Sequence, residues 1–123
     1  MTKVHYVRLF ADDDGESHFS EEEMDLTSVD FAPPAPPLHL SAFAAAKQMA
    51  FVAREAGWFG DWHPAPRRQF YILLAGEVEA QASDGEVRRF RAGDIVLLED
   101  TTGKGHTSRV NLGDIAAIIQ LAD

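Results

Sequence analysis

The chain has 123 residues, with 20 acidic against 11 basic side chains and a formal charge of −9. This balance lacks the basic surface on which phosphate-driven binding depends, so DNA and RNA are excluded as expected partners. The absence of cysteine excludes disulfides, thiol catalysis and cysteine-based zinc sites. No stretch approaches the ~20 apolar residues that span a bilayer, so we expect a soluble, cytoplasmic protein that does not bind membranes.

The N-terminal third predicts two strands followed by an arm. Residues 4–10 mix β-branched and aromatic side chains, and the turn-forming run at 12–15 follows them, which indicates an opening strand and a hairpin. Four prolines within 31–39 exclude a central strand. We predict that residues 1–45 hold the first strands and a proline-rich arm. Packing of this arm on the barrel or a sister subunit is favoured over recognition by a proline-binding domain.

The rest of the chain reads as short β-strands within one domain, residues 1–123, because a chain of this length fits a single packed core. Further strands are expected at 47–54, 69–74, 77–82, 87–90, 95–98, 106–110 and 115–121. Gly76 is expected to end the second of these, and the Asp84-Gly85 turn predicts a tight hairpin because it tolerates positive φ angles. About eight to ten strands with regular turns are typical of a sandwich or barrel.

Glycines and polar residues recur at a defined spacing in the middle of the chain: Gly57, His63, Gln69 and Gly76. This spacing resembles the first motif of the cupin family, which runs Gly, five residues, His-x-His, three or four residues, Glu, six residues, Gly. Two family ligands are altered. Ala65 stands where the second histidine is expected, and Gln69 replaces the glutamate.

A second cupin motif is matched further along the chain. Gly93 and the run Gly103-Lys104-Gly105-His106 resemble its glycines and histidine. Thr101 stands at its proline position after a loop two residues longer than the pattern, and Asn111 comes one place late. The resemblance spans residues 57–111.

The resemblance implies an all-β fold, an antiparallel jelly-roll β-barrel or double-stranded β-helix, with an N-terminal β-arm. It also implies a homodimer that uses the arm and the edge strands. His63, Gln69 and His106 are the implied metal ligands. A first-row divalent ion such as Mn, Fe, Ni or Zn accepts imidazole nitrogen and amide oxygen, and water would fill the remaining positions.

Other side chains are candidates for contacts with a substrate. Residues two apart on a strand share a face, so Tyr71 is expected to point into the barrel with Gln69. Tyr71 or Arg67 would orient the substrate, and Arg67 could clamp a carboxylate through its planar fork of donors. Glu99 and Asp100 could supply a general base, although acidic residues at strand ends more often cap turns.

Three functions are consistent with these residues. The first is a metal-dependent enzyme, a lyase, isomerase or oxygenase, acting on a small organic molecule. The second is a metal-free module that binds or senses a small molecule. The third is an oligomeric structural protein with a filled pocket. The fold does not decide among them.

Overall fold

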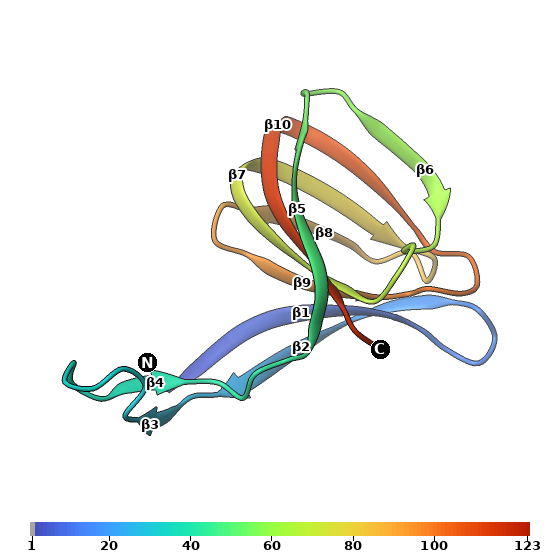
Figure 1. Cartoon of the computed structure of the whole chain (residues 1–123). Coiled ribbons are helices and arrows are strands. Elements are labelled where there is room, and N and C mark those ends of the chain that lie inside the picture. The colour runs from blue at the N-terminus through green and yellow to red at the C-terminus, as the bar shows by residue number, and fades with distance from the viewer. Residues whose placement is uncertain (1) are drawn as a thin grey trace.

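The computed structural model describes residues 2–123 and contains ten strands in that range (Figure 1). They are β1 (Lys3–Ala11), β2 (Ser17–Asp25), β3 (Thr27–Val29), β4 (Leu38–Leu40), β5 (Ala46–Arg54), β6 (Phe59–His63), β7 (Gln69–Ala82), β8 (Val87–Arg91), β9 (Ile95–Glu99) and β10 (His106–Leu121). Within the described residues, no helix is long and apolar enough to cross a membrane.

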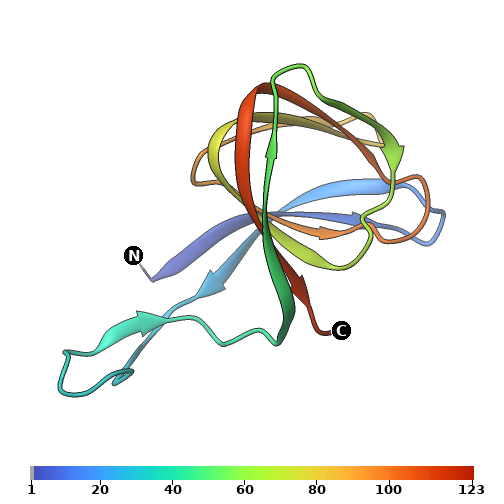
Figure 2. The same ribbon diagram turned by 45° about the horizontal axis from the view of Figure 1, so that its top comes forward.

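Eight of the strands form one curled sheet. Its main path runs β2-β1-β9-β7-β10-β5, while β6 pairs with β10 and β8 pairs with β7. The strands wrap around a common interior, as Figure 2 shows. The predicted all-β jelly-roll barrel is confirmed. One ladder differs from a purely antiparallel barrel: β1 and β9 are parallel, which is possible because most of the chain lies between them and provides the long crossover.

The core lies where the inward faces of the strands meet. Along β7, Val78, Ala80 and Ala82 alternate with outward-facing residues, as the two-residue period of a strand requires. Leu9 from β1 and Val110 from β10 pack into the same cluster. The two longest strands, β7 and β10, contribute residues to both the core and the wall of the barrel interior.

The prediction that Gly76 ends a strand is wrong, because β7 continues through it. Gly76 has a φ of +89°, and a Cβ placed there would lie 2.3 Å from the carbonyl oxygen of Gly113. The register between β7 and β10 shifts around Leu112 and Ile115 at the same level. The glycine thus allows two strands to bend together. For the same reason, the two strands expected at 106–110 and 115–121 are one strand, β10.

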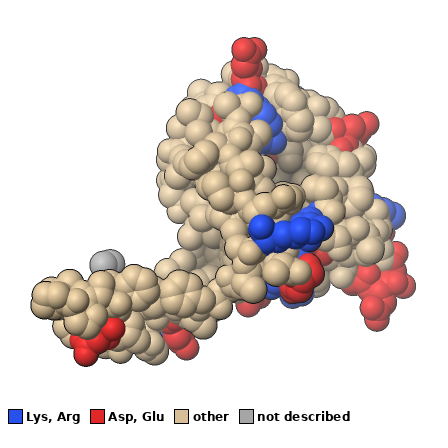
Figure 3. Space-filling model, in the orientation of Figure 1, with Lys and Arg blue, Asp and Glu red and all other residues tan. Residues whose placement is uncertain are grey.

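The proline-rich segment forms an arm, residues 27–40, in which β3 and β4 pair as a separate two-stranded sheet. It projects away from the barrel as a distinct lobe in Figures 1 and 3. The prolines between the two strands are exposed. Packing of this segment against its own barrel, one of our expectations, is therefore not what the structure shows. Packing on a sister subunit stays a prediction.

Candidate functional site

A cavity of about 150 Å³ lies inside the barrel. Most of its wall is apolar and is formed by core residues of β1, β2, β7, β8 and β9, together with Val52 of β5 and Ile118 of β10. The polar side chains on the wall are those of Arg54, His63, Gln69, Tyr71, His106 and Ser108. Such a cavity, apolar with a few convergent polar groups, is typical of a small-molecule site.

The metal-ligand positions of the cupin resemblance meet at this cavity. His63, Ala65, Gln69 and His106 all line it. Tyr71 also lines the cavity, whereas Arg67 is not among the lining residues. The structure therefore brings the proposed metal ligands and one of the two substrate-orienting candidates to a single interior.

His63 and His106 face each other across neighbouring strands. His63 ends β6, His106 begins β10, and the two are direct register partners. Their ring centroids are 4.7 Å apart with an interplanar angle of 53°. Gly105 makes this approach possible, because a Cβ placed there would lie 2.0 Å from the carbonyl oxygen of His63. Any side chain at position 105 would push the two strands apart.

Hydrogen bonds fix which nitrogen of each ring is free. The His63 Nδ1 lies 2.6 Å from the carbonyl oxygen of Asp61, which can only accept, so Nδ1 carries the hydrogen. The His106 Nδ1 lies 2.6 Å from Oδ2 of Asp100, whose side chain is buried. A neutral imidazole that donates through Nδ1 keeps a lone pair on Nε2. Histidines that bind metals are commonly oriented by the same kind of hydrogen bond to a carboxylate or a backbone carbonyl.

Asp100 provides the carboxylate that contacts the histidine pair, through its Oδ2. Oδ1 of Asp100 is buried and makes no hydrogen bond within the part of the chain that the structure describes. The backbone carbonyl of Asp100 accepts a hydrogen bond from the Ala65 amide at 3.0 Å. Asp100 thus joins two of the motif positions. The preceding residue, Glu99, instead forms salt bridges with Arg8 of β1 and with Arg68, which immediately precedes β7.

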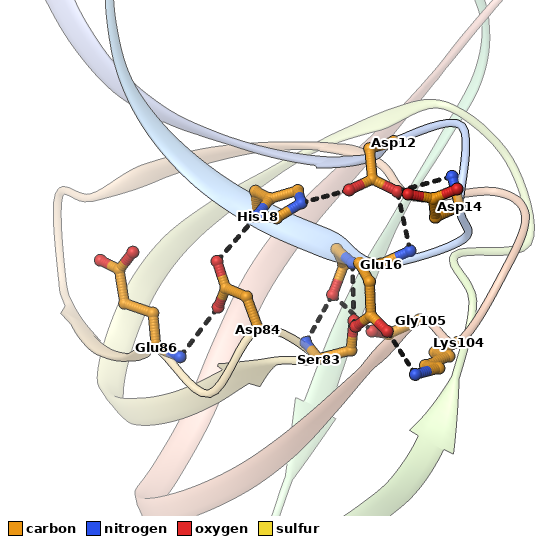
Figure 4. A network of polar contacts seen from close by, with 10 residues as sticks. Asp12, Asp14, Glu16, His18, Ser83, Asp84, Glu86, Lys104 and Gly105 are labelled. Carbon is orange, nitrogen blue, oxygen red and sulfur yellow. Dashed lines mark hydrogen bonds and ion pairs between the residues drawn. The ribbon is translucent and has the colours of Figure 1, made fainter.

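The loop that leads into His106 is anchored by a polar network (Figure 4). The hydroxyl of Ser17 donates to the carbonyl of Gly105 at 2.7 Å and accepts from the amide of Ser83 at 2.7 Å. Lys104 pairs with Glu16, and its amide donates to the carbonyl of Gly15 at 2.9 Å. Because three turns are tied together here, the backbone before His106 has little freedom to move.

The separation of the two imidazoles is compatible with a shared divalent transition metal ion. Zinc–nitrogen bonds are about 2.1 Å, so two imidazoles on one ion have centroids roughly 5 Å apart, close to the observed separation. Gln69 is a weaker third donor, because its Oε1 already accepts a hydrogen bond from Gln120 at 3.0 Å. The described residues hold no group of three His, Cys, Asp or Glu side chains placed to bind an ion. A metal site here would therefore have two imidazoles and one amide.

A second polar cluster on the wall was not predicted from the sequence. Arg54, the last residue of β5, forms a salt bridge with the buried Asp114 of β10 and donates to the Tyr71 hydroxyl at 2.6 Å. Burial opposes ionisation of Asp114, but hydrogen bonds from Arg54 and Tyr71 outweigh it and hold its pKa below the ordinary value. Burial, together with the hydrogen bond to Asp114, raises the pKa of Tyr71 well above its ordinary value.

No sequence signal could have found this cluster. Arg54 and Asp114 are 60 positions apart, and neither belongs to a motif. They meet because β5 and β10 pair in a register that sets Arg54 opposite Asp114.

Comparisons with known proteins add little. No protein-family model matches the chain, and no curated protein matches its sequence significantly. Among solved structures, a putative ethanolamine utilization protein Q from Salmonella typhimurium LT2 is similar, with 15% identity and a TM-score of 0.42 over 100% of both chains. This likeness is too weak to carry an argument about function. The assignment of the fold rests on the strand arrangement itself.

Proposed function

We propose that the chain binds a small organic molecule in the barrel cavity and acts on it as a metal-dependent enzyme. His63 and His106 would hold a divalent transition metal, with Gln69 as the third donor. The observation that carries the proposal is the pair of imidazoles on the cavity wall, each anchored through Nδ1 so that Nε2 remains available. When bound, the metal would polarise an oxygen of the substrate or activate a water molecule.

The chain's own groups have separate tasks in this proposal. The apolar wall excludes water and strengthens every electrostatic interaction inside the cavity. Asp100 holds the His106 ring in one orientation through Oδ2. The Tyr71 hydroxyl donates its one hydrogen to Asp114 and accepts from Arg54, and its raised pKa means that it is not a general base. Lyase, isomerase and oxygenase chemistries all fall within this proposal.

The second candidate is a metal-free module that binds the same kind of molecule. Two observations favour it: Ala65 provides no donor where the family has a histidine, and the Gln69 oxygen is already engaged by Gln120. In this case the two imidazoles would form hydrogen bonds to the ligand directly.

Elemental analysis of the untagged protein separates these candidates. The protein is dialysed against trace manganese, iron, nickel and zinc, and wild type is compared with His63→Ala, His106→Ala and the control His39→Ala, which lies in the arm. We expect near-stoichiometric metal in wild type and the control, and its loss in the other two. His63→Ala is the safer variant, because its ring bonds only a backbone carbonyl.

Wild type without metal after this treatment would contradict the enzyme proposal. Binding of small molecules that is indifferent to chelator would then support the metal-free module. Neither metal nor ligand would indicate a structural protein with a filled pocket.

A further inference from the structure

The charged groups at the barrel cavity already compensate one another. Asp114 forms a salt bridge with Arg54, and the Tyr71 hydroxyl donates its one hydrogen to Asp114 while it accepts from Arg54. These three side chains therefore add no net charge to the wall. An ionic ligand that left water for this cavity would find no counter-charge among them, which opposes the binding of ions.

Four other polar side chains on the cavity wall have hydrogen-bonding capacity that remains unused: His63, Gln69, His106 and Ser108. Nε2 of each imidazole carries a lone pair, because Nδ1 is the donor. Oε1 of Gln69 accepts from Gln120, but neither Nε2 of Gln69 nor the Ser108 hydroxyl bonds to residues 2–123. Although the two residues are only 6% and 8% exposed, neither atom is among the sealed, unpartnered polar atoms of that range. The wall thus offers both acceptors and donors to a ligand.

Strand β10 places the Ser108 hydroxyl on the same face as the His106 ring. The two residues are two positions apart, so their side chains project into the cavity together from backbone positions about 7 Å apart. One oxygen atom that hydrogen-bonds to two groups holds them roughly 5.6 Å apart, because each bond spans about 2.8 Å. A single hydroxyl group between them can therefore donate to Nε2 of His106 and accept from Ser108.

The rest of the cavity limits the size and polarity of the ligand. Its volume is about 150 Å³, and a cavity of roughly this volume with apolar walls accepts a molecule the size of benzene. Phe19, Phe90 and Val96 are among the apolar residues that line it. Such walls favour a compact apolar body with a single polar group.

We infer that the cavity takes a small neutral hydroxyl compound, an alcohol or phenol whose hydroxyl lies between His106 and Ser108 and whose apolar body fills the barrel. This inference rests on the proposed function, because it names the class of molecule that the cavity binds. A hydroxyl both donates and accepts, as these groups require. A carboxylate only accepts and would face the imidazole lone pairs, whereas an ammonium only donates and would leave the Gln69 amide nitrogen unpaired.

Calorimetric titration of the full chain tests the inference. The protein is first treated with chelator, so that the result does not depend on a bound metal. Four probes share a benzene ring: phenol, fluorobenzene, benzoate and benzylammonium. We expect phenol to bind about tenfold or more tightly than fluorobenzene, which has no hydrogen to donate, because two hydrogen bonds are lost. The two ions should bind more weakly than phenol because the wall does not compensate their charge.

Ser108→Ala tests the position of the hydroxyl with little change in side-chain volume. The variant should bind phenol about three- to tenfold more weakly than wild type, since one hydrogen bond is lost, and fluorobenzene within about twofold of wild type. Ser28→Ala is the matched control, because Ser28 is an exposed serine in the arm. It should bind phenol as wild type does.

The failures of the two proposals can be told apart. Equal affinity for phenol and fluorobenzene, or tighter binding of either ion, overturns the inference and leaves the cavity as a small-molecule site. Undiminished phenol binding by Ser108→Ala also overturns it. Binding of none of the four probes contradicts small-molecule binding itself and overturns the inference with it.

A second measurement keeps the test decisive if Ser108→Ala does not fold. The imidazole Nε2 resonance of His106 in wild type is followed by NMR during titrations with phenol and with fluorobenzene, and His39 in the arm is the internal control. A shift of the His106 resonance with phenol alone supports the inference. An unmoved resonance, or the same shift with both probes, overturns it.

Discussion

The barrel and the arm contain similar apolar residues but place them in opposite environments. In the barrel, Leu73 is 0% exposed within a continuous core. Next to the arm, Phe43 is 79% exposed, and its ring contacts only that of Phe31 among the aromatic pairs of the described chain. A two-stranded hairpin by itself is marginally stable in water. The comparison teaches that the barrel can stabilise itself, whereas the arm has apolar groups that a single chain leaves uncovered.

The largest expected effect on the free energy of unfolding comes from truncating a side chain in the barrel core. Leu73→Ala removes a side chain with no solvent exposure and leaves a cavity, so we expect a loss of about 2–5 kcal/mol in the free energy of unfolding. Phe43→Ala, the matched control beside the arm, should cost less than about 0.5 kcal/mol in the monomer. Urea unfolding measures both. Similar losses in the two variants would show that the arm region is packed in solution after all.

The second prediction concerns what covers the arm and the edge strand. Phe51 on β5 is 68% exposed, and β5 lies at one end of the sheet path. Edge strands and exposed apolar residues are features that a second copy would protect. We expect wild type to sediment as a homodimer and the double variant Phe43→Asp/Phe51→Asp to sediment as a monomer.

Val87→Asp is the control for this experiment, because Val87 is also exposed but lies on β8. It should leave the dimer intact. A monomeric wild type, or a double variant that still dimerises, would refute the prediction.

The smallest effect is expected at the polar network in Figure 4. The His18 ring bonds to Asp12 at 2.6 Å and to Asp84 at 2.8 Å, and it joins the turn after β1 to the turn after β7. The hydrogen bond that the His18 ring makes to the carboxylate of Asp12, and then the one to Asp84, raise the pKa of His18 above its ordinary value of 6.5. A raised pKa means that the protonated ring favours the folded state. This contribution is complete below about pH 6.5 and is lost as the pH rises through the folded-state pKa.

We therefore predict that His18→Gln lowers the melting temperature more at pH 5.5 than at pH 9. The effect should correspond to less than about 1 kcal/mol, because these groups are partly exposed and solvent screens them. Thermal unfolding at the two pH values measures it. An equal or larger loss at pH 9 would contradict the assignment of the pKa shift to these two carboxylates.

The sequence was sufficient for the features that depend on neighbours along the chain. The alternation of residues in β7 placed Gln69 and Tyr71 on one face, and both line the cavity. The Asp84-Gly85 turn forms the predicted hairpin, with a φ of +98° at Gly85. The spacing that pointed to His63 and His106 also identified residues that share one wall. Their role as metal ligands stays a prediction.

Residues whose partners lie far away in the chain could not be predicted in this way. Arg54 is an ordinary charged residue at the end of a strand until the β5–β10 register places it opposite Asp114. Arg67 stood next to a motif and was the natural candidate, but its side chain is not on the cavity wall. Position in the sequence orders residues along a strand and does not identify the strand across the sheet.

The sequence by itself therefore determined the all-β class, most of the strand positions and the turns, because periodicity and turn chemistry are local properties. The spacing along the chain also singled out His63 and His106, the two histidines that line the cavity. Only the tertiary structure decided that β7 and β10 run unbroken through the bend at Gly76, that β1 lies parallel to β9, and that Arg54 faces the cavity. Each of these depends on which strands pair and in what register, and pairing is set by the packing of the whole core.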